Sequence, residues 1–290
     1  MTSPRPSLRG IALLLLALAF FVLLDATAKT LAQRWPVPLL VWARYTVHCL
    51  VMTLFLAPSM GRRLLHSRQP GRQVLRALLL LGTTYCVISA LGWLPLAEAT
   101  AIAFAAPLLV ALLARPLLGE RIGGLQWMAV LLGFGGVLLI AQPGSGLAPQ
   151  GMAFALGGAA CYALYQIMTR QLSAAEHPLT MLYYTALVGT LATTPLLPWV
   201  WPGTLPHGVD AILIGAMGIL GGIGHFLLIL AFRRAPASSL SPFTYFQLVL
   251  ATLFGWWAFN HAPGPDALLG MGIIALAGLM LAVGHSKTQP

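Results

Sequence analysis

The hydrophobic positions of this sequence are grouped in long apolar runs, separated by short stretches that contain Pro, Gly or charged residues. The run Ile11–Leu24, IALLLLALAFFVLL, is typical. Membrane β-strands would alternate apolar and polar residues, so these runs indicate helices. A helix needs roughly 20 residues to cross a bilayer, and the breaks between the runs predict ten such helices. Their ranges are 8–32, 36–57, 73–93, 96–117, 122–141, 151–171, 178–200, 209–231, 237–259 and 265–284.

The composition agrees with an all-α integral membrane protein. Of the 290 residues, 59% are hydrophobic and 8% are charged, whereas a soluble domain carries about 25% charged residues. A soluble fold with so few charges would expose large apolar patches, but lipid accepts apolar side chains. Helices also pair their own backbone polar groups, as the hydrocarbon region requires. The connections between the predicted helices are too short to hold another domain.

The basic residues predict the orientation of the helices in the membrane. Of the 16 Lys and Arg residues, 13 are assigned to one set of connections, the opposite set holds Arg34, and Lys29 and Arg44 lie within predicted spans. The positive-inside rule then places both termini in the cytoplasm. The 13 are Arg5, Arg9, Arg62, Arg63, Arg68, Arg72, Arg76, Arg115, Arg121, Arg170, Arg233, Arg234 and Lys287. This dispersed charge, +10 in total, indicates membrane topology and not nucleic-acid binding, and we expect the arginine-rich loop Arg62–Arg76 to contact anionic lipid headgroups.

The two halves of the sequence resemble each other at a nearly constant offset in residue number. The matched pairs include Gly10 with Gly151, Lys29 with Arg170, Pro38 with Pro178, Pro58 with Pro198, Gly82 with Gly222, Tyr85 with His225 and Ala97 with Ala237. We call the shift that carries Gly10 onto Gly151 the repeat offset. Residues 1–142 and 143–290 therefore form two predicted repeats of five helices each. Because five is odd, the second repeat enters the membrane from the opposite side. Inverted repeats of this kind are common in secondary transporters, whose substrate site lies near the midplane.

The stretch Leu94–Glu120 resembles the fourth helix of the EamA-type drug/metabolite transporter superfamily. It has small residues at its start, a proline at position 107 and a closing Leu-Gly-Glu. The second copy, Ala235–Asn260, departs from that pattern with Gln247 in place of the proline and Asn260 in place of Glu. The resemblance implies a transporter in the cytoplasmic (inner) membrane of a bacterium. Within the superfamily, central aromatic residues favour the YddG-type aromatic amino-acid exporter branch.

Four ionisable residues lie within the predicted spans near the outer surface. Asp25 and Lys29 are four residues apart and share one helix face, so they are able to pair. Arg44 and Glu98 lie at a similar depth on the second and fourth helices. One interpretation is a network that fixes helix packing, with Lys29 extending to the interface. The other is an outer gate, or Arg44 as a clamp for a substrate carboxylate, because ionisable groups within spans commonly serve function.

Side chains with rings and hydrogen-bonding groups supply the candidates for a central cavity. Tyr85 and His225 lie near the middles of their helices and match each other in the repeat. Glycines beside both leave room or allow helices to approach closely. The alternative is that these rings only bond to neighbouring helices. The full set of cavity candidates is Phe20, Tyr85, Phe104, Tyr162, Tyr165, His225, Tyr245 and Gln247.

These features together predict a secondary transporter that moves amino acids or similar small metabolites by alternating access, and the resemblance implies that it exports them. No Walker motif is present, so ATP hydrolysis is not expected. The three cysteines, Cys49, Cys86 and Cys161, lack metal-ligand spacing, and neither a metal nor another cofactor is expected. A broad permease for drugs or nucleoside-like metabolites is an alternative. An intramembrane lipid-modifying enzyme would need a cluster of His, Asp or Cys at one interface, and the sequence shows none.

Overall fold

The computed structural model describes residues 8–118, 124–141, 146–173, 175–204, 206–232 and 243–287, with Arg234 and Leu240. Arg5, Glu120, Arg121 and Arg233, which carry parts of the sequence predictions, lie outside the described residues. The described residues are almost entirely helical. The helices are α1 (Leu8–Ala32), α2 (Val37–Met60), α3 (Pro70–Trp93), α4 (Leu96–Ala103), α5 (Ala105–Leu118), α6 (Gly124–Ile140), α7 (Pro149–Ser173), α8 (Pro178–Thr193), α9 (Leu197–Val200), α10 (Gly208–Phe232), α12 (Phe246–Phe259) and α13 (Pro265–Lys287). Short 3-10 turns at Gly61–Leu64 and Thr194–Leu196 follow α2 and α8.

Six of the described helices are long and apolar enough to cross a membrane. They cover Leu8–Ala32, Val37–Leu64, Pro70–Trp93, Leu96–Leu113, Pro149–Thr169 and Gly208–Leu228. Three shorter apolar helices cover Trp127–Ile140, Phe246–Phe259 and Pro265–Met280. The prediction of a helical membrane protein is confirmed, and the count of ten spans stays a prediction.

Prolines mark the first residue of four helices and one interruption. Pro70, Pro149, Pro178 and Pro265 begin α3, α7, α8 and α13, where the missing N–H costs no intrahelical bond. Pro107, by contrast, lies inside a predicted span, and the helix is broken between α4 and α5 at Phe104. A proline inside a helix leaves the carbonyl four residues earlier without its bond. That carbonyl belongs to the last residue of α4, so the break follows directly from the proline.

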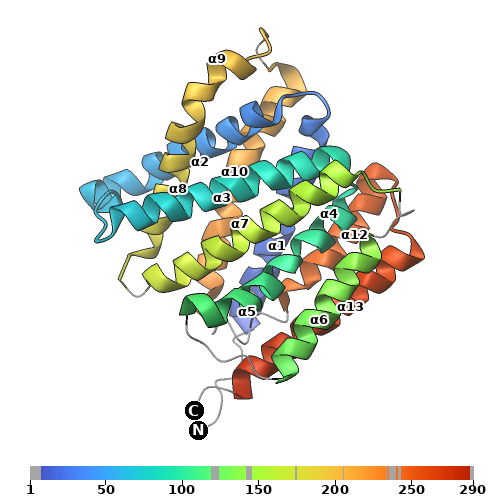
Figure 1. Cartoon of the computed structure of the whole chain (residues 1–290). Coiled ribbons are helices and arrows are strands. Elements are labelled where there is room, and N and C mark those ends of the chain that lie inside the picture. Colours follow the sequence, from blue (N-terminus) through green and yellow to red (C-terminus); the bar gives the residue numbers. More distant parts are fainter. Residues whose placement is uncertain are drawn as a thin grey trace.

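The helices pack in pairs that join the two halves of the sequence. The most extensive contacts are between α1 and α10, between α3 and α7, and between α6 and α13. Figure 1 shows α3 alongside α7 and α6 alongside α13. The largest apolar core cluster draws residues from α1 to α7 and from α10, α12 and α13. The two halves are therefore interleaved in one bundle.

Glycine allows α2 and α10 to approach closely. A Cβ atom on Gly218 would lie 2.5 Å from Cβ of Val47 and 3.1 Å from the carbonyl oxygen of Arg44. One turn earlier, Gly215 has nothing within 4 Å of the same position. The helix separation at Gly218 therefore depends on the missing side chain.

Candidate functional site

A group of polar side chains lies where α1, α2, α3 and α10 meet. Arg44 of α2 donates from Nη1 to Oγ1 of Thr84 on α3 over 3.1 Å. The hydroxyl of Tyr45 lies 2.9 Å from the same Thr84 oxygen. Asp25 of α1 is the carboxylate whose charge interacts with Arg44. The structure thus brings two of the predicted outer charges together across α1 and α2.

Two histidines extend this group. The rings of His48 on α2 and His225 on α10 are parallel, with centroids 6.5 Å apart. Phe21 of α1 meets the edge of the His225 ring at a centroid distance of 5.0 Å. His48 is buried, and its Nε2 has no hydrogen-bond partner among the described residues. A Cβ on Gly222 would lie 3.3 Å from Cδ2 of His48, so this glycine admits the ring. We call Asp25, Arg44, His48, Thr84 and His225 the central polar group.

Tyr85 does not join its repeat partner His225. Its side chain is 40% exposed, and it lines a cavity of about 330 Å³ beside α2, α3 and α8. Successive residues of a helix point about 100° apart, so the neighbouring Thr84 takes the inward direction at this level. The pseudo-symmetric pairing of Tyr85 with His225 is therefore absent from the described structure.

The other ring candidates form two separate contacts. Tyr162 and Tyr165 of α7 stack with centroids 5.7 Å apart. Phe104, at the break between α4 and α5, lies 5.0 Å from the ring of Tyr245. The remaining two cavity candidates, Phe20 on α1 and Gln247 on α12, are half-buried.

Arg76 is a buried charge that the sequence reasoning missed, because it was counted with the loop bases. It lies in the second turn of α3 with 1% of its surface exposed. Its Nη2 donates to the carbonyl of Met181 and, over 2.9 Å, to Oγ1 of Thr185 on α8. Nη1 reaches Oγ1 of Thr169 on α7 at 3.3 Å, and Nε reaches Oε1 of Gln73 at 3.2 Å. Its position within the predicted span 73–93 was the available signal, since a charge inside a span is rarely incidental.

Lys29 pairs with backbone and not with Asp25. Its Nζ donates to the carbonyls of Leu91 and Leu94, at 3.1 and 2.6 Å. Gln33, one turn further along α1, donates to the carbonyl of Gly92 at 2.9 Å. These carbonyls belong to the end of α3, where the last turn of a helix leaves its acceptors free and attracts positive charge. Lys29 therefore bonds the carbonyls at the end of α3 in place of the predicted i,i+4 partner Asp25.

Glu98, the fourth predicted outer charge, is 3% exposed. Its Oε1 lies 3.1 Å from Nε2 of His261, which follows α12. Its other oxygen is buried without a hydrogen-bond partner among the described residues. A cavity of about 410 Å³ opens close by, lined by Lys29, Thr30, Gln33, Arg34, Gly92 and Phe259. The four predicted charges therefore fall into two pairs whose charges interact, Asp25 with Arg44 and Lys29 with Glu98.

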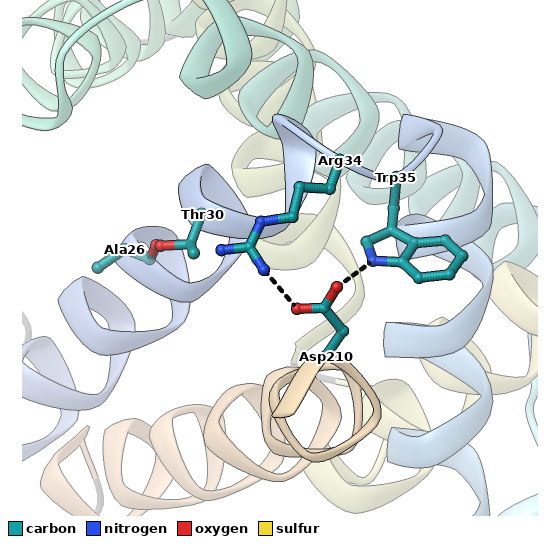
Figure 2. Close-up of polar contacts among 5 residues, drawn as sticks. All are labelled: Ala26, Thr30, Arg34, Trp35 and Asp210. Carbon is teal, nitrogen blue, oxygen red and sulfur yellow. Dashed lines mark hydrogen bonds and ion pairs between the residues drawn. The ribbon is translucent and has the colours of Figure 1, made fainter. Parts of the chain in front are cut away.

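Two carboxylates join the halves at opposite ends of α2. Figure 2 shows Asp210, in the first turn of α10, accepting from Nη1 of Arg34 and from Nε1 of Trp35, each at 2.9 Å. At the far end, Oε1 of Glu176, between α7 and α8, accepts from Oγ of Ser67 at 2.7 Å. It also accepts from the backbone N–H groups of Arg68 and Gln69, at 2.9 and 3.1 Å. We call these the Asp210 contact and the Glu176 contact.

Comparison with known proteins identifies the family. The EamA-like transporter family matches twice, over residues 8–142 and 149–283. A solved crystal structure superposes with a TM-score of 0.69 at 23% identity, covering 94% of this chain and 97% of that one; it supports the fold alone.

Named relatives cover nearly the whole chain. The S-adenosylmethionine uptake transporter of Rickettsia prowazekii is 26% identical over 97% of this chain and 95% of its own length. The riboflavin transporter of Vibrio cholerae is 28% identical over 93% and 91%. The pseudopaline exporter CntI of Pseudomonas aeruginosa is 29% identical over 96% of each. The chain therefore belongs to the EamA-like transporter family, a family of membrane transporters and not of enzymes.

Proposed function

We propose that the protein is a secondary transporter that moves a small amphipathic solute by alternating access between two inverted sets of five membrane helices. The first set comprises residues 1–142 and the second residues 143–290. One arrangement of the sets opens the central site to one side of the membrane, and the related arrangement opens it to the other.

The helix positions support this repeat. The repeat offset carries the first residues of α1, α2 and α6 onto those of α7, α8 and α13. The same offset carries 96–118, which holds α4 and α5, onto 237–259, where α12 ends. Residues 233, 235–239 and 241–242, which include the start of the ninth predicted span, lie outside the described residues.

The helix contacts are the observation that carries the proposal. Exchanging each helix for its repeat partner turns the contact of α1 with α10 into that of α7 with α3. It likewise turns α2 with α10 into α8 with α3, and α1 with α12 into α7 with α5. All six contacts are present, and α6 with α13 maps onto itself. Such exchange is expected of two structurally equivalent halves related by a pseudo-twofold axis.

The central polar group is our proposed substrate site. It lies on α1, α2 and α10 and on α3, so it takes residues from the α1–α10 pair and from one member of the α3–α7 pair. Arg44 offers a cation for a carboxylate, and Nε2 of His48, which has no partner among the described residues, offers one further hydrogen bond. The ring faces of Phe21 and His225 suit an apolar or aromatic portion. This combination favours an amino acid or a related ring-bearing acid, and we propose export as its direction, with both termini in the cytoplasm.

A second candidate is a permease for nucleoside-like metabolites. The relatives named for S-adenosylmethionine and riboflavin favour it, because both compounds join a planar heteroaromatic ring to a polar chain. The rings and hydrogen-bonding side chains of the central polar group also suit compounds of this kind. The two candidates differ in which labelled solute crosses the membrane.

Flux in liposomes tests both candidates. The purified protein is reconstituted and supplied with labelled phenylalanine, leucine, S-adenosylmethionine or riboflavin, loaded inside or outside. The proposal predicts saturable, protein-dependent flux of at least one of them. Flux of neither amino acid removes the amino-acid candidate, and flux of none contradicts the proposed site chemistry. Repeating the assay with an imposed pH gradient separates proton coupling, in which the initial rate changes, from uniport, in which it does not.

Site variants locate the pathway. His225→Ala and Arg44→Gln remove a ring and a cation from the central polar group, and each is expected to lower flux at least tenfold with normal yield. Tyr85→Ala is the matched control, because the Tyr85 side chain lies in the cavity beside α2, α3 and α8 and not in the central polar group. Equal loss in all three variants would mean that the central polar group is not the pathway.

A further inference from the structure

One end of the bundle is closed by bonds that cross between two helix groups. We call α1, α2 and α10 the first trio, and their repeat partners α7, α8 and α3 the second trio. Lys29 and Gln33 of the first trio donate to the carbonyls of Leu91, Gly92 and Leu94 at the end of α3 in the second. Arg44 and Tyr45 also reach Thr84 of α3. The trios are thus bonded together at the end where α1 and α3 terminate.

The equivalent contact at the other end is missing from the described structure. The helices α1 and α3 touch each other, as do α2 and α3. Within the described residues, their repeat partners α7 and α10, and likewise α8 and α10, make no contact of comparable extent. In a protein with two equivalent halves, a helix contact that is present at one end and missing at the other is expected when the trios are closed at the first end and separated at the second. The positive-inside assignment makes the closed end the outer one.

The repeat supplies a second cation at the position of Lys29. The repeat offset carries Lys29 onto Arg170, in the last turn of α7, and carries Leu91 onto Phe232, the last residue of α10. Lysine and arginine are both permanent donors with no acceptor. Each is able to satisfy free carbonyls at a helix end, where a cation is also favoured by the helix dipole.

We propose that Lys29 and Arg170 are alternating gate residues: Lys29 holds the end of α3 in the present inward-open state, and Arg170 holds the end of α10 in the outward-open state. This inference rests on the proposed function. The bonds of Lys29 and those of Arg170 do not form at the same time, because closing one end of the bundle moves the trios apart at the other end. Release of Lys29 exposes its ammonium group to the adjoining cavity of about 410 Å³, where water replaces the carbonyls. Substrate binding then shifts the populations of the two states, because each state is stabilised by a similar set of bonds.

Distances between spin labels test the exchange, and the comparison of Lys29→Met with the parent protein needs no substrate. In a background with Cys49, Cys86 and Cys161 replaced by Ala, one pair is Trp93→Cys with Val209→Cys at the outer end. The other is its repeat equivalent, Arg68→Cys with Arg234→Cys, at the inner end. All four positions are exposed.

Lys29→Met is expected to lengthen the outer distance and shorten the inner one. Arg170→Met is expected to leave the outer distance short and the inner one long, even where substrate moves the parent protein outward-open. Thr30→Val is the matched control, because Thr30 lines the same cavity but bonds the carbonyl of Ala26 in its own helix; both distances should stay unchanged. Lys29→Arg should preserve the parent distances.

Two results would overturn the exchange. The first is a Lys29→Met protein in which neither distance moves, and the second is one in which both lengthen, as simple loosening would cause. If Lys29→Met fails to fold, Gln33→Leu removes the bond to Gly92 and is read in the same way. Because the distances need no flux, a protein that transports none of the tested solutes still gives a result for the gate.

Discussion

Asp210 bonds the connection between α1 and α2 through both carboxylate oxygens, one to Arg34 and one to Trp35, each at 2.9 Å. The Glu176 contact occupies the equivalent place in the repeat, since the repeat offset carries Trp35 onto Glu176 and Gln69 onto Asp210. The acidic residue occupies a different position in each contact. Asp210 lies at the start of a helix, whereas Glu176 lies in the connection between two helices. Both contacts tie a helix of one half to a connection of the other.

The Asp210 contact is expected to stabilise the protein weakly and in a salt-dependent manner. Arg34 has a side chain that is 59% exposed, and exposed ion pairs contribute about 0.2–1 kcal/mol. Asp210→Asn keeps the shape and removes the charge, so we expect a small fall in melting temperature at low salt in detergent. At high salt the difference from the parent protein should disappear. A large fall that salt does not change would contradict this interpretation.

The Glu176 contact is expected to matter more, because Glu176 is only 7% exposed and one of its oxygens accepts three bonds. Glu176→Gln replaces charged acceptors with neutral ones at the start of α3, where negative charge is favoured. Hydrogen bonds to charged groups contribute about 1.5–3 kcal/mol, so the melting temperature should fall further than in Asp210→Asn. Thermal unfolding of the two variants side by side measures this order, and the reverse order would count against the contact.

Arg76 is expected to be the most sensitive position on α3. Arg76→Met removes the hydrogen bonds from the guanidinium group to Thr169 of α7 and to Met181 and Thr185 of α8, and hydrogen bonds to charged groups contribute about 1.5–3 kcal/mol each. We expect loss of folded protein on size-exclusion chromatography. Arg72→Met is the control, because Arg72 is an exposed arginine one turn away on the same helix. Equal behaviour of the two variants would show that the buried bonds of Arg76 do not hold α3.

Gly218 tests the close approach of α2 and α10. Gly218→Ala brings a methyl group against Val47 and the backbone of Arg44, and overpacking of this kind costs about 1–3 kcal/mol. Gly215→Ala adds the same methyl group where nothing lies within 4 Å, and alanine favours a helix over glycine. Thermal unfolding should therefore show a loss for the first variant and no loss for the second. A neutral Gly218→Ala would mean that the helices are not in contact there.

Much of the helical framework followed from the sequence, because apolar length and proline position act locally. The predicted range 8–32 matches α1, and the predicted starts at 178 and 265 match α8 and α13. The polar contacts did not follow, because they depend on which side of a helix faces a neighbour. Thr84 takes the inward position that Tyr85 was expected to fill. Lys29 was paired with Asp25 by spacing alone, since the free carbonyls at the end of α3 are visible only after the helices are packed.

The proposed inverted repeat places His66 and His207 on opposite sides of the membrane. The repeat offset carries one onto the other, and both are exposed in connections. In the background without native cysteines, His66→Cys and His207→Cys are each treated in intact cells with a thiol reagent that does not cross the membrane. In the inverted arrangement we expect His207→Cys to react in intact cells and His66→Cys to react only after lysis. Reaction of both from the same side would contradict the inverted arrangement, and the transport mechanism built on it.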